Sequence, residues 1–67
     1  MKHPLSTWRN LAHMTQIEFA KAVGVDKSTA YMWESGRAKP QARNIAKIEQ
    51  VLNINWSENV ERKGVHK

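Results

Sequence analysis

Basic side chains dominate the chemistry available to this chain. Eleven lysines and arginines stand against six acidic residues among 67 positions, which gives a formal net charge of +5 and an isoelectric point of about 10.0. One short segment, Arg37-Ala38-Lys39-Pro40, is a basic connector between two apolar stretches. Such an excess of cations in a small chain indicates a polyanionic partner, although net charge alone also fits a basic protein without one.

The other reactive residues lack the spacing that catalysis or metal binding requires. There is no cysteine, so neither a disulfide nor a thiolate metal site can form. The three histidines, His3, His13 and His66, show no metal-ligand spacing. There is no Ser/His/Asp set, glycine-rich phosphate loop or pair of carboxylates in a cleft. We therefore predict that the protein is not an enzyme and needs no metal or cofactor. A chain this short leaves no room for a deep pocket, so no small-molecule ligand is expected.

The apolar residues recur at helical spacing rather than in alternation, which predicts an all-α fold of four or five short helices and no sheet. Ser6 is the expected N-cap of the first helix, which should end near His13. The inner face of this helix is expected to consist of Leu5, Trp8, Leu11 and Ala12.

Two capped segments with a short turn between them follow. Thr15 and Glu18 have the spacing of a capping box, and Gly24 should end the helix that they begin. Asp26 is the expected N-cap of a helix over 27–35 that Gly36 ends. Two helices joined by a glycine-containing turn are the signature of a helix-turn-helix. The inward residues of the two helices are expected to be Phe19, Ala20, Val23, Ala30 and Trp33.

A fourth helix is predicted over 41–52, with Pro40 at its entry and Asn53 closing it in a left-handed conformation. Its apolar stripe is Ile45, Ile48, Val51 and Leu52, and Ile54 and Trp56 are placed to pack beneath the bundle. We expect one domain over 1–60 and a basic, flexible tail over 61–67. No apolar run suits a signal peptide or a membrane span, so we expect a cytoplasmic protein that does not enter a membrane.

Two segments, Met14–Val25 and Trp33–Pro40, resemble the lambda-repressor/Cro-like (Xre-like) helix-turn-helix family. The resemblance lies in the combined spacing of Thr-Gln, Ala-x-x-x-Gly and Glu-x-Gly-x-x-x-Pro, and it extends over residues 5–54. It implies a compact all-α domain of four to five helices that binds palindromic double-stranded DNA operators, usually as a homodimer, at least on DNA. His13 stands where the family often has glycine. Ala30 replaces a larger aliphatic residue, and Trp33 or Met14 is expected to fill that space.

The resemblance also implies which residues meet the DNA. The third helix would lie in the major groove, where its first turns contact base edges. Lysine donates to guanine O6 and N7, serine discriminates less, and a methionine suits the thymine methyl group. The residues at base-reading positions are Lys27, Ser28, Tyr31 and Met32; the alternative is that they are simply solvated.

Further residues would contact the DNA backbone or brace the reading helix. Gln16 lies at a helix N-terminus, which favours a phosphate. The expected phosphate contacts are Gln16, Ser35, Arg37, Lys39 and Arg43, against the alternative of a solvated basic loop. Arg9 and Glu34 match a family ion pair that links the first helix to the end of the third. In that case Arg9 neutralises a carboxylate that would otherwise repel phosphate.

These expectations describe a transcriptional regulator, most simply a Cro-type repressor of a phage, prophage or bacterium that occludes a promoter. An antitoxin of a toxin–antitoxin pair is an alternative. An antitoxin usually has a segment to cover its toxin, and only 61–67 would be available here. A controller protein of a restriction-modification system is a variant of the first class.

Overall fold

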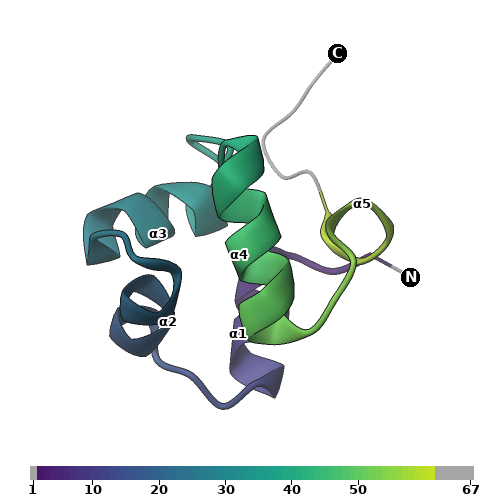
Figure 1. Ribbon diagram of the computed structural model, residues 1–67, viewed down its shortest axis with the longest axis horizontal. Coiled ribbons are helices and arrows are strands. Elements are labelled where there is room, and N and C mark those ends of the chain that lie inside the picture. Colours follow the sequence, from purple (N-terminus) through teal and green to yellow (C-terminus); the bar gives the residue numbers. More distant parts are fainter. Residues whose placement is uncertain (1, 62–67) are drawn as a thin grey trace.

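The computed structural model describes residues 2–61, which form five short helices packed around one core (Figure 1). The helices are α1 (Leu5–Leu11), α2 (Gln16–Val23), α3 (Lys27–Ser35), α4 (Ala42–Leu52) and α5 (Trp56–Asn59). This confirms the predicted all-α fold, and no described helix is long and apolar enough to cross a membrane. Of the predicted basic tail over 61–67, positions 62–67 lie outside the described residues.

The start and end of α2 and the end of α3 follow the sequence signals. The Glu18 amide donates to Thr15 Oγ1 at 3.1 Å, and the Thr15 amide donates to Glu18 Oε1 at 2.8 Å, which completes the capping box. Gly24 and Gly36 close α2 and α3 with φ of 91° and 81°, in the left-handed region where a Cβ is costly. Local chemistry therefore fixes where the two helices of the helix-turn-helix meet.

The core lies where α2, α3 and α4 pack together, with α4 standing against α2 (Figure 1). Phe19, Val23 and Ile48 are its largest fully buried side chains. Ala30 is also fully buried, while Trp33 is buried and Met14 packs against the same cluster. Of the two large side chains expected near Ala30, Trp33 thus belongs to the core and Met14 is partly buried against it. The buried apolar set is Leu5, Phe19, Ala20, Val23, Ala30, Trp33, Ile48, Leu52 and Val60.

Hydrogen bonds join the two ends of the described chain. The His3 amide donates to Asn59 O at 3.0 Å, and the Glu61 amide donates to His3 O at 2.8 Å. The indole Nε1 of Trp8 also donates to Asn59 O, at 2.6 Å. These bonds hold the end of α5 against α1 and the residues before it.

The structure corrects the prediction for the first helix. Pro4, not Ser6, is the N-cap residue of α1, and the Thr7 amide donates to Pro4 O at 3.0 Å. The inner face of α1 is formed by Leu5, Trp8 and Arg9. Leu11, placed on that face by the sequence, is 62% exposed, because it lies about 120° around the helix from the centre of this face.

Three further details differ from the sequence prediction. Ala12 is exposed because it follows the end of α1, where the chain turns through His13 with φ 60°. Pro40 does not enter the fourth helix: Gln41 is the N-cap residue of α4, and Pro40 is buried before it. Asp26 is the N-cap residue of α3 as predicted, but its side chain makes no capping hydrogen bond.

Candidate nucleic-acid interface

Helix α3 has a buried side and an exposed side, and the predicted base-reading residues all lie on the exposed one. Lys27 and Ser28 are exposed in the first turn, and Tyr31 and Met32 are 50% and 37% exposed one turn later. The buried side consists of Ala30, Trp33 and Glu34. One surface therefore presents an ammonium group, two hydroxyl groups and a thioether. These groups include the hydrogen-bond donors and the apolar atoms that can contact base edges.

The single carboxylate of α3 is withdrawn from that surface by an ion pair. Arg9 Nε lies 2.7 Å from Glu34 Oε2, and Arg9 Nη2 donates to Glu34 Oε1 at 3.2 Å. Arg9 Nη1 also donates to Met14 O at 2.8 Å. The side chains of Arg9 and Glu34 are 14% and 8% exposed. The pair therefore joins α1 to the end of α3 and compensates the charge of a buried carboxylate.

Gln16 lies beside the same carboxylate. Its Nε2 donates to Glu34 Oε1 at 3.1 Å, so Glu34 accepts from residues on both α1 and α2. Gln16 is half-buried at the first position of α2, where backbone amides favour an anion. Sequence reasoning placed Gln16 near phosphate but missed its bond to Glu34. Residues 18 positions apart along the chain carry no local signal for such a contact.

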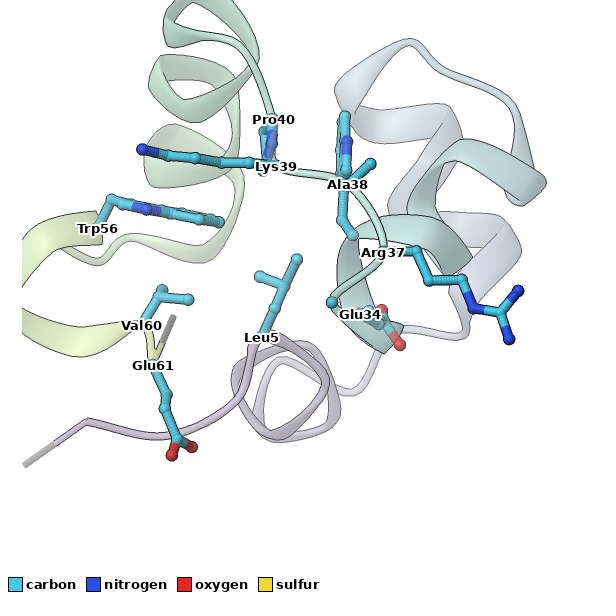
Figure 2. A pocket seen from close by; sticks show the side chains of 11 residues that line it. Leu5, Glu34, Arg37, Ala38, Lys39, Pro40, Trp56, Val60 and Glu61 are labelled. Carbon is cyan, nitrogen blue, oxygen red and sulfur yellow. The ribbon is translucent and has the colours of Figure 1, made fainter. Parts of the chain in front are cut away.

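The loop between α3 and α4 carries the predicted phosphate-contacting cations. The amides of Arg37 and Ala38 donate to Met32 O at 3.0 and 3.2 Å, which folds the loop back on α3. The Arg37 and Lys39 side chains are exposed and extend in opposite directions, with Lys39 on the Trp56 side (Figure 2). The loop thus keeps Arg37 next to α3 but directs Lys39 toward α5.

Two members of the predicted phosphate set remain. Arg43 is exposed in the first turn of α4. Ser35 is half-buried, and its hydroxyl group donates to Met32 O at 3.2 Å. In this conformation the hydroxyl proton is not available to donate to another group. The predicted phosphate set is therefore spread over α2, the end of α3, the α3–α4 loop and the start of α4.

The described residues contain no group of three or more His, Asp or Glu side chains that could hold a metal ion. Buried polar side-chain atoms among them all have hydrogen-bond partners. The polar groups inside this domain therefore serve its own structure, and the groups available to a partner lie on the surface.

Comparison with known proteins identifies the class that this fold and surface define. The helix-turn-helix family model matches residues 5–59, so the chain belongs to the lambda-repressor-like helix-turn-helix family. Members of this family are DNA-binding regulators of transcription rather than enzymes, and this chain is a DNA-binding domain of that class. No curated protein and no solved structure matched the chain.

Proposed function

We propose that this protein is a sequence-specific repressor of the Cro type, which binds a palindromic operator as a homodimer and excludes RNA polymerase from an overlapping promoter. The observation that carries the proposal is the division of α3 into two sides. Ala30, Trp33 and Glu34 anchor the helix, whereas Lys27 and Met32 are left in solvent.

Base reading is assigned to the exposed side of α3. In this arrangement the first turn of the helix enters the major groove, where Lys27 donates to guanine and Ser28 donates or accepts. Tyr31 and Met32 follow one turn later and supply a hydroxyl group and an apolar contact for a thymine methyl. The buried ion pair beneath them supports this assignment, because it fixes the helix that carries these side chains.

Backbone contacts are assigned to the residues around the end of α3. The exposed cations Arg37, Lys39 and Arg43 would neutralise phosphates, with Gln16 and Ser35 adding hydrogen bonds. Gln16 is held by Glu34 in the free protein. Contacts of this kind orient the domain on DNA without reading its sequence, so they set the affinity and its salt dependence.

A homodimer would determine the spacing of the two half-sites on DNA. Two copies would place their α3 helices in successive major grooves on one side of the duplex, about 34 Å apart. Because the protein must meet chromosomal or phage DNA, we place its action in the cytoplasm of a bacterial cell. An antitoxin or a restriction-modification controller would use the same DNA surface, and the difference between these roles lies in what operator binding does.

The decisive experiment is selection of binding sites from random duplex DNA, followed by transcription in vitro from a promoter that overlaps the selected site. We expect two symmetric half-sites one helical turn apart and reduced transcription. The control is Lys27→Ala combined with Ser28→Ala, which keeps the buried side of α3 intact. Selection of no common sequence would contradict base reading, and increased transcription would replace the repressor with a controller-type activator.

A further inference from the structure

A small apolar hollow lies beside the proposed phosphate-contacting loop, and the proposed DNA contacts do not account for it. It opens between the start of α1, the loop before α4 and the segment around α5, and its volume is about 140 Å³ (Figure 2). Most of its lining is apolar, from Leu5, Trp33, Ala38, Pro40, Trp56 and Val60, and charged residues line it as well. An enclosed apolar cavity of about 150 Å³ accommodates benzene, so this hollow, which is partly open to solvent, has room for one six-membered ring.

The rim of the hollow is cationic. Lys39 and Trp56 also border a second, adjoining hollow, which Lys2 lines as well. Neither lysine forms an ion pair with a carboxylate among the described residues. Two carboxylates lie near the apolar hollow, but that of Glu34 is held by Arg9, and that of Glu61 extends away from the opening (Figure 2). Neither carboxylate therefore faces an anionic group at the opening, and the long Lys39 side chain, which extends along Trp56 (Figure 2), is within reach of it.

We propose that this hollow binds a small aromatic carboxylate with one ring. The ring lies against Leu5, Trp56 and Val60, and the carboxylate accepts a hydrogen bond from the Lys39 ammonium group at the rim. A ligand of this class matches both the volume and the charge of the site. The sequence predicted no small-molecule ligand because the chain is short. The hollow exists nonetheless because the two ends of the described chain meet over the α3–α4 loop.

Binding at this site has a consequence for DNA that rests on the proposed function. Lys39 belongs to the proposed phosphate-contacting set, so a bound carboxylate and a DNA phosphate would compete for the same ammonium group. The ligand then weakens DNA binding, and by linkage DNA weakens ligand binding by the same factor. Binding of the ligand to the free protein does not depend on this consequence.

In the test, the free protein is titrated with sodium benzoate. Binding is monitored by the NMR signals of the indole Nε1–H groups of the three tryptophans. We expect saturable shifts of the Trp33 and Trp56 signals with a dissociation constant on the order of 1 mM, as a fragment of this size permits. Benzyl alcohol should bind several-fold more weakly because it lacks the charge, and acetate should give no saturable shift. Equal shifts with acetate, or no saturation with benzoate, would overturn the proposal.

Paired variants locate the site. Lys39→Met should weaken benzoate binding about fivefold, as expected for loss of one surface charge pair, whereas Lys21→Met on the exposed side of α2 should not. Ala38→Phe should fill the hollow and abolish the shifts, with Ala46→Phe on the exposed side of α4 as its matched control. Ala38 and Ala46 are both exposed, and thermal melting verifies that each variant folds.

Two outcomes would assign the hollow differently. Unchanged benzoate binding in Ala38→Phe would place the ligand elsewhere. The Trp33 and Trp56 signals could instead shift with protein concentration in the absence of benzoate. If Ala38→Phe removes that concentration dependence, a second copy of the chain occupies the hollow. DNA affinity is measured separately: a benzoate complex that leaves it unchanged overturns only the competition with phosphate.

Discussion

Arg9 and Glu34 are 25 positions apart in the sequence and form a two-point ion pair, with Arg9 Nε 2.7 Å from Glu34 Oε2. The pair links α1 to the end of α3, and Glu34 also accepts from Gln16 of α2. Three of the five helices are thus connected through one carboxylate. The orientation of α3, and with it the position of the proposed base-reading side chains, depends on this contact as well as on apolar packing.

Replacing Arg9 with methionine should destabilise the domain strongly. The carboxylate of Glu34, 8% exposed, would remain buried without its cation, which costs about 3–5 kcal/mol. Urea unfolding followed by circular dichroism measures the loss. The double variant Arg9→Met/Glu34→Met should recover most of it, because no unpaired charge remains. Equal destabilisation in the single and double variants would mean that packing of the arginine, rather than the charge pair, holds the helices.

Thr15→Ala should lower the free energy of unfolding by about 1 kcal/mol, because the Glu18 amide loses its capping oxygen. The matched control is Ser6→Ala. Ser6 lies in the first turn of α1, and Pro4 holds the N-cap position, so this change should have little effect. The free energies of unfolding of the two variants are compared by denaturant titration. A larger loss of stability for Ser6→Ala than for Thr15→Ala would contradict the assignment of the N-caps.

His13→Gly should stabilise the protein by about 0.5–1 kcal/mol. His13 has φ 60° and an exposed side chain, so glycine removes the left-handed penalty of about 1–2 kcal/mol while adding some entropy to the unfolded chain. The neighbouring Ala12→Gly, at φ −83°, gains no such relief and should be destabilising. Thermal unfolding of both variants tests the sign; a lower melting temperature for His13→Gly would show that the imidazole makes a favourable contact.

Lys27→Ala should lose discrimination at one base pair of each half-site, by about 1–3 kcal/mol, because a bidentate donor to guanine is removed. Fluorescence anisotropy with operator duplexes that differ at single positions measures this. Lys21→Ala, a cation on the exposed side of α2, is the control for net charge. If Lys27→Ala weakens specific and random DNA equally, Lys27 contacts phosphate instead of a base.

Arg37→Ala should weaken binding to all sequences and make the slope of log K against log salt shallower by about one unit, as loss of one phosphate contact requires. Titrations between low and moderate salt provide the slope. Lys21→Ala again serves as the comparison, since it removes one charge outside the proposed contact set. An unchanged slope for Arg37→Ala removes this residue from the phosphate contacts.

The sequence alone determined the features that depend on neighbouring residues. Thr15 and Glu18 define the start of α2. The residues that end α2, α3 and α4 adopt the left-handed conformation, and they are Gly24, Gly36 and Asn53. These signals act over three or four positions, through side-chain caps and the conformational freedom of glycine and asparagine. The spacing of apolar residues likewise placed Phe19, Ala30, Trp33 and Ile48 in the core.

Only the tertiary structure decided features that depend on distant segments. Ser6 has the chemistry of a cap, yet Pro4 takes that position because Leu5 is buried and the chain before it is tied to the end of α5. The hollow beside Trp56 and the bond from Gln16 to Glu34 join residues that no local spacing relates. Local rules select helices and their ends, whereas the meeting of side chains from different helices is set by how the whole core packs.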